Sequence, residues 1–529
     1  MRISTGQYFA NSLSGYSKNF SDITKTQEQI SSGTRIKTAA DDPVGASKLL
    51  QLQQQSARLG QYSANITTAT NSLNNEESVL SSISDALQSA RELTLQAGNG
   101  GLTDDDRASI SAELGQIEDT VYGLLNSKDA NGAYLFAGSK TGVQPYVKNA
   151  DGSYTYQGDE TQLSLQVSDT LSMATNDTGY SVFEQASNIS RTAVALTEPS
   201  TDDGRFTLTS GSMTSQTSYN SSFKADEPYT LTFTSATAYT ITDAGGNDIT
   251  AESSGKGAYD STNASGSTIS LRGVDFQAAV LSEDGDDALN MDDVLKDHTF
   301  TLASKADTIS TSRISTNTSS AQITGGVVGD EAKYSTTFPS GGVVVKFTSD
   351  TAYSVYASPV TSSSKAIGTG TWSDSGTGTN TISAAGVSLT MTGSPKDGDQ
   401  FSVSADAHQT QSVLNTLSQL RQVLSTPIAG NSAGAASVQD AVASAIGNLD
   451  SSSSRIDLTR GSIGARGNAL DIQAAENSSL KLANTATQSS IGDTDTAEAS
   501  VKLTLQQTML EASQLAFSRI SQLSLFNKL

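Results

Sequence analysis

The sequence predicts an α+β protein: a long antiparallel helical-bundle core formed by both termini, with a small β-hairpin region and inserted β-rich tandem modules. Near both ends, apolar residues recur every three or four positions, which is typical of helices that pack against other helices. Between about residues 202 and 403, short alternating segments rich in Ser, Thr and Gly replace this pattern. Only 35% of the 529 residues are apolar, so we expect several thin domains rather than one thick core.

The apolar stripes at the two ends are the strongest packing signal in the chain. A stripe of this kind needs a second helix to cover it, whereas chain ends usually fray. The stripes therefore predict an assembly interface, in which the two ends pack against each other and against neighbouring subunits. The residues expected in this interface are Phe9, Leu13, Tyr16, Phe20, Ile23, Ile30, Val501, Leu505, Met509, Ala512, Ala516, Ile520 and Leu523. An ordinary intramolecular bundle is the competing interpretation, because most amphipathic helices simply cover a core.

Two acidic breaks separate the terminal helices from the rest of the chain. Pro43 disfavours helical geometry at Asp42 and suits the first turn of a new helix. The carboxylates of Asp41 and Asp42 supply cap oxygens at the start of that helix. Before the C-terminal helix, Asp493 and Asp495 form a similar break. We expect a hinge or cap at both places, with no chemistry required of these residues.

Long helices should follow inside each break. From residue 43 to about residue 96, apolar residues recur every seventh position, at Leu52, Leu59, Ile66, Leu73 and Leu80. A third helix begins with the acidic residues 104–106, and short strands between residues 133 and 167 predict β-hairpins. Residues 438–489 predict a second long inner helix, although its three glycines lower the helix propensity.

The middle of the chain contains an internal repeat. Residues 233–241 match residues 347–355, and residues 268–274 match residues 381–387, at offsets of 114 and 113 positions. A nearly constant offset indicates tandem modules. The expected domains are a terminal coiled-coil assembly domain (1–42 and 491–529), a helical rod domain with β-hairpins (43–201 and 404–490), β-rich module 1 (202–302) and β-rich module 2 (303–403).

Charge and cysteine content narrow the classes of partner. The formal net charge is −23 at pH 7, and the chain contains no cysteine. Such a surface repels phosphate groups, which argues against nucleic acids and anionic membranes as partners. The first residues lack the basic and apolar segments of a cleavable signal, and no segment is apolar enough to span a membrane. If the protein is exported, we expect a route without a cleaved signal peptide.

No catalytic constellation can be assembled from the sequence, so we expect no enzyme and no cofactor. His298 and His408 lie far apart, and no His-Glu-x-x-His motif occurs. The acidic residues 283–287, together with Asp292 and Asp293, could suggest a calcium loop. They lack the ordered spacing of an EF-hand loop, and we expect a solvated loop without a metal.

Several segments resemble the flagellin superfamily. Residues 31–36 with residues 40–43 (Ala-Asp-Asp-Pro), residues 91–97 and residues 491–498 are similar to its core motifs. Within this superfamily, the resemblance is to the hook-associated protein 3 family of hook–filament junction proteins. The resemblance is carried by residues 1–5, 131–138, 156–159 and 523–529, and it covers roughly residues 1–190 and 400–529.

The resemblance implies a structural adaptor of the bacterial flagellum, extracellular at the hook–filament junction. It implies type III export without a cleaved signal peptide, and a cytoplasmic flagellar export chaperone that holds the C-terminal helix. The implied partners are further copies in a helical array, hook-associated protein 1 on the hook side and flagellin on the filament side, joined by polymerisation of helix bundles. Two alternatives stay open: a flagellin filament subunit, and a surface adhesin that acts through the β-rich insert.

Overall fold

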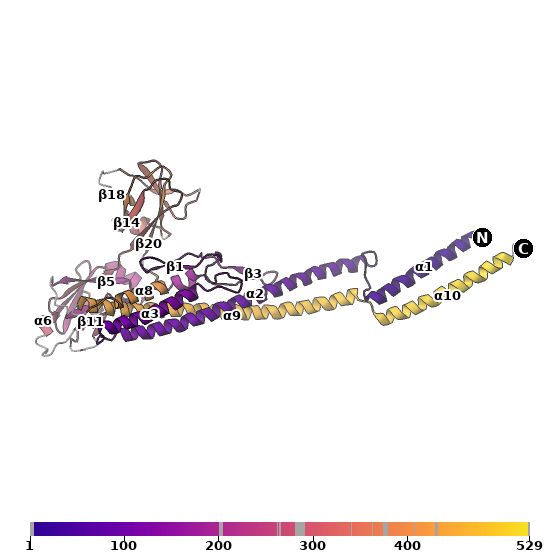
Figure 1. Ribbon diagram of the computed structural model, residues 1–529, viewed down its shortest axis with the longest axis horizontal. Coiled ribbons are helices and arrows are strands. Elements are labelled where there is room, and N and C mark those ends of the chain that lie inside the picture. Colours follow the sequence, from indigo (N-terminus) through magenta and orange to yellow (C-terminus); the bar gives the residue numbers. More distant parts are fainter. Residues whose placement is uncertain are drawn as a thin grey trace. The chain divides into compact units, whose positions relative to one another are not determined.

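The computed structural model is an α+β protein, as expected, with long helices and several β-sheets (Figure 1). It describes residues 5–199, 205–261, 263, 266–280, 291–339, 341–361, 363–373, 379–406, 408–428 and 432–526. The chain divides into two compact units, each built from several segments. Unit 1 comprises Met1–Asn75, Leu163–Asn176 and Ser462–Leu529, and unit 2 comprises Glu76–Gln162 and Asp177–Gly461.

Unit 1 is built mainly from long helices. They are α1 (Thr5–Ser32), α10 (Thr496–Phe526) and parts of α2 (Pro43–Ala97) and α9 (Ser432–Gly492). Helices α1 and α10 lie side by side (Figure 1). Thr26 Oγ1 donates to Gln506 Oε1 (2.9 Å), while nearer the chain ends Gln514 Nε2 donates to the Tyr16 hydroxyl (3.3 Å). Because residue numbers fall on α1 as they rise on α10, the two helices are antiparallel.

Helix α9 is longer than the sequence predicts. It runs unbroken from Ser432 to Gly492, whereas the glycines predicted a weaker helix over residues 438–489. Each glycine inside a helix costs about 1 kcal/mol relative to alanine. Burial of Ile456, Ile463 and Leu470 offsets this cost, since all three are at most 5% exposed.

The helical part of unit 2 contains a buried carboxylate. Its elements are residues 76–97 of α2 and 432–461 of α9, α3 (Asp104–Leu125), α8 (Val413–Leu424), the hairpin of β1 (Tyr146–Lys148) and β2 (Tyr154–Tyr156), and the π-helix η1 (Tyr180–Glu184). Glu118 of α3 accepts hydrogen bonds from the Tyr154 hydroxyl (2.6 Å), Lys148 Nζ (2.9 Å) and Arg421 Nε (2.7 Å). These three bonds join α3, the hairpin and α8 at one point.

Strands β5 to β12 enclose one hydrophobic core. One antiparallel sheet has the order β5-β12-β8-β9, and a second has the order β10-β11-β6 with β7 paired to β11. The strands are β5 (Thr192–Glu198), β6 (Phe206–Leu208), β7 (Ser212–Met213), β8 (Tyr229–Ser235), β9 (Ala238–Thr242), β10 (Ser267–Leu271), β11 (Val274–Val280) and β12 (Thr299–Ser304). The short helices are α4 (Gln216–Ser218), η2 (Tyr219–Phe223), α5 (Lys224–Asp226), η3 (Thr250–Glu252) and α6 (Met291–Leu295).

Strands β13 to β20 enclose a separate hydrophobic core. One antiparallel sheet has the order β13-β20-β15-β16-β17, and the other has the order β14-β19-β18. The elements are β13 (Thr308–Arg313), β14 (Gln322–Val328), α7 (Glu331–Thr337), β15 (Val343–Phe347), β16 (Ala352–Ala357), β17 (Ala366–Thr371), β18 (Thr379–Ala384), β19 (Val387–Thr392) and β20 (Gln400–Asp406).

The two sets of strands repeat one topology. The order β5-β12-β8-β9 corresponds to β13-β20-β15-β16, and β10-β11-β6 corresponds to β18-β19-β14. The matched residues 233–241 lie on β8 and β9, and residues 347–355 lie on β15 and β16. Strand β17 is an addition to the second set. The module boundaries at residues 202, 302 and 403 stay predictions; strand β5, which starts at Thr192, already pairs with β12.

The acidic segment considered for calcium is only partly described. Residues 283–287 lie outside the described residues. The sequence predicts a solvated loop for Asp292 and Asp293. This prediction is wrong for these two residues, which lie in helix α6. Asp292 Oδ1 accepts a hydrogen bond from the backbone nitrogen of Ala236 (2.5 Å). This carboxylate therefore fixes the turn between β8 and β9.

Candidate assembly surface

The contact between α1 and α10 is a narrow seam. On α1, Ile23 and Thr26 are buried, with exposed fractions of 8% and 2%. Along α10 the buried and half-buried positions recur every three or four residues, as in a coiled coil. These positions are Ala499, Leu503, Gln506, Leu510, Ser513 and Phe517. The two ends of the chain therefore cover one face of each other.

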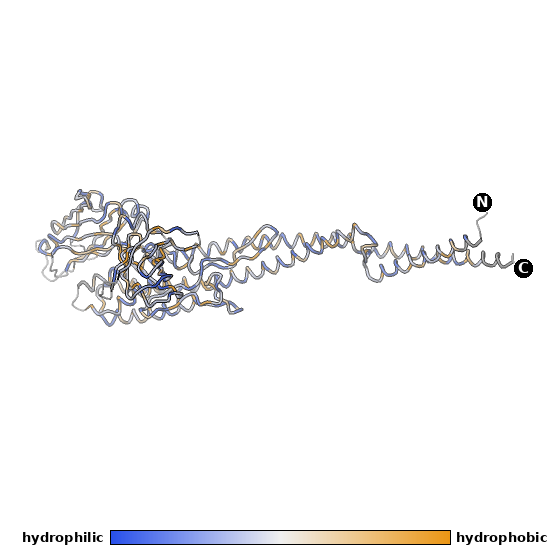
Figure 2. The backbone as a smooth tube through the Cα atoms, turned by 90° about the horizontal axis from the view of Figure 1, so that it is seen from above, coloured by the Kyte–Doolittle hydropathy of each residue, from blue (hydrophilic) through white to orange (hydrophobic). Residues whose placement is uncertain are grey.

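Most of the residues predicted for the interface lie outside this seam. Ile23 is buried and Ile30 is half-buried, but Leu13 and Phe20 are 58% and 57% exposed, and Val501 is 71% exposed. Tyr16, Leu505, Met509, Ala512 and Ala516 are also exposed, and the side chains of Phe9, Ile520 and Leu523 lie outside the described residues. Hydrophobic positions recur along both helices (Figure 2). One chain thus leaves large apolar side chains open, and their contact with neighbouring copies stays a prediction.

The sequence prediction omits the α10 residues that face α1. Helix α10 carries two interleaved apolar stripes, and the prediction contains the exposed one. Leu503, Leu510 and Phe517 form the other stripe, which is half-buried in the seam. The signal was present in the sequence, because these three residues are each seven positions apart.

The exposed apolar residues lie on opposite sides of the α1–α10 pair. On one side, a groove of 270 Å³ is lined by Ser12, Leu13, Tyr16, Ser513, Gln514 and Phe517. At 3.6 residues per turn, Ala512 and Ala516 point about half a turn away from Gln514 and about a quarter of a turn away from Ser513 and Phe517, which also line the groove. We call the side with the groove, Leu13, Tyr16 and Phe20 the groove face. We call the side with Val501, Leu505, Met509, Ala512 and Ala516 the α10 face.

The breaks that follow α1 and precede α10 are hydrogen-bonded to each other. Arg35 N donates to the Gly492 carbonyl (2.6 Å), and Thr494 N donates to the Gly33 carbonyl (2.9 Å). The Arg35 side chain also donates to the carbonyl of Ile491, through Nη2 (2.6 Å). Gly33 has a φ of +69°, a conformation that glycine adopts without strain. The two segments expected to be hinges therefore form one joint.

The acidic residues of the joint have distinct local roles. Asp42 Oδ1 accepts from Gly45 N (2.9 Å) in the first turn of α2, and Asp495 Oδ1 accepts from Ala497 N (2.9 Å) and Glu498 N (3.1 Å) in the first turn of α10. Both therefore act as helix caps.

Asp41 and Asp493 stabilise the chain between the helices. Asp41 forms a salt bridge with Lys25 of α1 (2.7 Å) and accepts from Thr38 N (2.9 Å). The hydrogen bond from Lys25, with that from Thr38, holds the pKa of Asp41 well below its ordinary value. Asp493 forms an antiparallel bridge with Thr34. A hinge motion at this joint stays a prediction.

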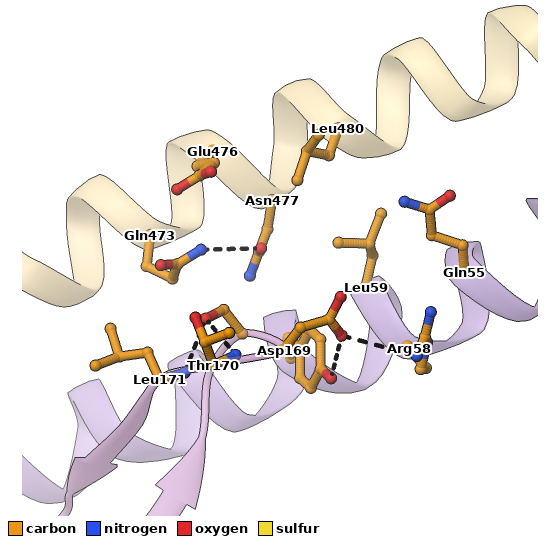
Figure 3. Close-up of a pocket in the computed structure, with 12 residues that line it drawn as sticks. Gln55, Arg58, Leu59, Asp169, Thr170, Leu171, Gln473, Glu476, Asn477 and Leu480 are labelled. Carbon is orange, nitrogen blue, oxygen red and sulfur yellow. Dashed lines mark hydrogen bonds and ion pairs between the residues drawn. The ribbon is translucent and has the colours of Figure 1, made fainter.

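A second concavity in unit 1 lies where a small hairpin enters between α2 and α9 (Figure 3). The hairpin consists of β3 (Ser164–Gln166) and β4 (Ser172–Ala174). Asn65 of α2 donates to the Gln166 carbonyl (2.7 Å), and Asn477 of α9 donates to the Val167 carbonyl (3.0 Å). These bonds fasten the hairpin to both helices.

The cavity beside the hairpin has a volume of 440 Å³ and a mixed polar and apolar lining. At the hairpin tip, Asp169 accepts from the Tyr62 hydroxyl (2.9 Å), a bond that raises the pKa of Tyr62. Figure 3 shows Asp169 and Arg58 on one side and Leu480 on the other. The side chains that line the cavity include no nucleophile placed beside a base, so we assign the cavity no catalytic role.

Among the described residues, no group of three or more His, Asp or Glu side chains is placed to hold a metal ion. No described helix combines the length and the apolar character needed to cross a bilayer.

Comparison with known proteins identifies relatives of part of the chain. The model of the bacterial flagellin N-terminal helical region matches residues 3–141. Flagellar hook-associated protein 3 of Salmonella typhimurium is 38% identical over 208 residues, which are 39% of this chain and 63% of that protein. The protein of the same name from Escherichia coli is 36% identical over 199 residues, 38% of this chain and 60% of that protein. The matches thus span less than two thirds of either relative.

A crystal structure of flagellar hook associated protein-3 from Legionella pneumophila covers 83% of this chain and 98% of that chain. The identity is 20% and the TM-score is 0.47. These values support no conclusion about function. The sequence comparisons do confirm the resemblance expected from the motifs: this chain is similar to flagellar hook-associated protein 3, and its residues 3–141 match the bacterial flagellin N-terminal helical region.

Proposed function

We propose that this protein is a structural adaptor of the bacterial flagellum, which joins the hook to the flagellin filament by packing its terminal helices into a helical array of copies. One observation carries the proposal. Helices α1 and α10 bury one face against each other but leave apolar side chains exposed on two other faces. The chain that carries them is similar to flagellar hook-associated protein 3. A protein of this kind acts mechanically and needs no catalytic site.

The energetics favour assembly of many copies over a contact between two. Burying a Leu, Val, Met or Phe side chain fully contributes roughly 1.5–3 kcal/mol. The exposed side chains of one pair cannot gain this energy alone, because the seam is already filled. Association also costs translational and rotational freedom. Neighbours on both faces would double the buried apolar area for each copy, and this would offset the cost.

The partners and location follow from the same proposal. The hook side would contact hook-associated protein 1, the filament side would contact flagellin, and the protein would lie outside the cell at the hook–filament junction. Export would proceed through the flagellar type III apparatus without a cleaved signal peptide. Before export, a cytoplasmic flagellar chaperone would cover α10, because Val501, Leu505 and Met509 are exposed in a single chain.

A flagellin filament subunit is the first alternative, because residues 3–141 match the flagellin N-terminal region. The similarity to hook-associated protein 3 at 36–38% identity favours the junction protein. A surface adhesin acting through the β strands is the second alternative. Carbohydrate sites commonly use exposed aromatic faces, but Trp372, the single tryptophan, is buried in the core of the β13–β20 sheets. Trp372 therefore gives this alternative no support.

Deletion of the gene in its flagellated host tests the proposal. We expect hooks without filaments, and flagellin released into the medium, because the filament lacks its attachment. Re-expression of the full chain should restore filaments. Normal filaments in the deletion strain would refute the adaptor function, and loss of flagellin from both cells and medium would favour the flagellin alternative.

A deletion variant distinguishes the role of the β-rich insert from that of the terminal helices. Deletion of residues 203–403 should leave filament attachment intact, because the α1–α10 pair lies outside this segment. Loss of surface binding with normal motility would assign the β strands an additional adhesive role.

A further inference from the structure

We propose that a polar cavity in unit 2 binds a small zwitterion of the free α-amino acid class. The cavity lies between helices α8 and α9 and the chain next to strands β5, β7 and β12. Its volume is 280 Å³, just below the range of roughly 300–1,000 Å³ that is typical of sites for drug-sized ligands. The inference does not depend on the proposed adaptor function, because α1 and α10 contribute nothing to this lining.

Two opposite charges line the cavity without pairing. Lys305 Nζ donates to the carbonyl (2.9 Å) and to the hydroxyl (2.6 Å) of Ser190. Asp440 accepts from the backbone nitrogen (2.6 Å) and from the hydroxyl (2.6 Å) of Ser210. Within the described residues, neither charge forms a salt bridge. An ammonium group has more donors than Lys305 uses here, and a carboxylate has more acceptor sites than Asp440 uses. Both groups therefore keep capacity for a ligand.

Burial makes these two unpaired charges costly. It raises the pKa of Asp440 and lowers the pKa of Lys305, because a charged group loses hydration inside a protein. A ligand ammonium group beside Asp440 and a ligand carboxylate beside Lys305 would each form a charge-assisted hydrogen bond. A simple anion would be repelled by Asp440, and a simple cation would be repelled by Lys305. A zwitterion avoids both repulsions.

One face of α9 supplies the remaining polar groups. Asp440, Ser444 and Asn448 are each four residues apart, so they lie in a row along the helix. Asn448 is 5% exposed, and its Oδ1 accepts from the backbone nitrogen of Ile189 (2.8 Å). This bond fixes the amide and leaves its nitrogen as a donor for a ligand in the cavity. Asn448 and Lys305 would therefore receive the carboxylate, and Asp440 would receive the ammonium group.

The lining also limits the class of ligand. Of the described residues that line the cavity, Asp440 alone is acidic and none is aromatic. A divalent cation needs several oxygen ligands, and a nucleobase commonly stacks on an aromatic side chain. The lining includes the buried side chains of Leu420 and Ala445. These apolar contacts suit an amino acid with a small uncharged side chain, such as L-alanine.

Isothermal titration calorimetry of the full-length protein with L-alanine tests the proposal. We expect saturable binding with a dissociation constant of about 1 mM or lower. Ethylamine is L-alanine without its carboxylate, and propionate is L-alanine without its ammonium group. Each should bind at least about tenfold more weakly, because each leaves one buried charge of the cavity unmatched.

Variants test whether the binding occurs in this cavity. K305M and D440N each remove one charge, whereas S444L fills the cavity and keeps both charges. Each should weaken L-alanine binding by at least about tenfold. S454L is the matched control for S444L, because Ser454 is exposed on the same helix and does not line the cavity. Circular dichroism checks the helix content of every variant. The three small molecules on the unmodified chain decide the question even where a variant fails to fold.

Three results would overturn the proposal. They are no heat of binding with L-alanine up to about 10 mM, binding of ethylamine or propionate as tight as that of L-alanine, and L-alanine binding that K305M, D440N and S444L all leave unchanged. The deletion experiment above is a separate test. Normal filaments in the deletion strain would refute the adaptor function without affecting the calorimetric result.

Discussion

The inner helices and the terminal helices share one apolar spacing but reach opposite states. In unit 2, Leu80, Ile83 and Leu87 of α2 are at most 1% exposed, whereas Val501 and Leu505 of α10 are more than half exposed. Unit 2 gathers segments of α2, α3, α8 and α9, while α1 and α10 form a pair with a single seam (Figure 1). A heptad stripe therefore indicates that a helix packs against a partner helix. It does not indicate whether that partner belongs to the same chain.

Among the variants considered, Leu80→Ala should lower the free energy of unfolding most. The side chain is fully buried, so its removal leaves a cavity, and we expect a loss of about 2–5 kcal/mol in the free energy of unfolding. Urea denaturation followed by circular dichroism measures this loss. A loss below about 0.5 kcal/mol, the range of ordinary surface substitutions, would mean that the inner stripe is no better covered than the terminal one.

Glu118→Ala should be nearly as damaging within unit 2. It leaves Lys148 and Arg421 without their shared carboxylate, and removing one partner of a fully buried ion pair costs about 3–5 kcal/mol. The two basic side chains are each about a third exposed, so water recovers part of this cost. The same denaturation measurement checks the result. A matched control is Glu28→Ala, since Glu28 is well exposed on α1.

The same carboxylate makes unit 2 sensitive to pH. Burial alone would raise the pKa of Glu118, but the bonds from Tyr154, Lys148 and Arg421 outweigh it and lower this pKa below 4.5. A lowered pKa contributes stability that is present above the ordinary value and is lost as the pH falls through the folded value. The stability difference between the unmodified chain and E118Q should therefore shrink as the pH falls from the ordinary carboxyl pKa to the lower folded value and below it. A difference that grows over this range would contradict the assignment.

Gly447→Ala should have an intermediate effect. A Cβ at this position of α9 would overlap Cδ1 of Ile189 and lie 2.8 Å from its Cγ1, so the Ile189 side chain must move. Forced repacking of this kind costs about 1–3 kcal/mol, and the gain in helix propensity of about 1 kcal/mol offsets part of this cost. Gly123→Ala in α3 is the control, because its Cβ would meet nothing within 4 Å and only the gain in propensity remains. The unfolding temperature of the first variant should therefore lie below that of the control, and the reverse order would contradict this explanation.

Leu505→Ser should have the smallest effect on the folded chain. Its side chain is more than half exposed, so we expect a change in unfolding free energy within about 0.5 kcal/mol. Association should weaken clearly, because the α10 face loses its central side chain. Sedimentation velocity beside thermal unfolding separates the two quantities. Substantial destabilisation of the dilute monomer would contradict this expectation, because it would show that the Leu505 side chain is covered within one chain.

Much of the fold could be predicted from local patterns. The caps at Asp42 and Asp495 and the repeat in residues 233–241 and 347–355 all correspond to the expected elements. These features depend on a few neighbouring residues, which the sequence contains in full. The continuity of α9 could not be predicted from its glycines, because burial of distant side chains such as Ile463 compensates for their low propensity.

The sequence alone determined that both ends are helices with apolar stripes, since periodicity is a property of one helix. Only the tertiary structure decided which of two stripes on α10 meets α1, and that the remaining apolar residues lie on opposite sides of the pair. The physical reason is that a helix with one neighbour can cover only one of its faces. The choice depends on how the two helices fit together along the seam, where Thr26 bonds to Gln506 and Ile23 and Leu503 lose exposure, and spacing alone does not contain that information.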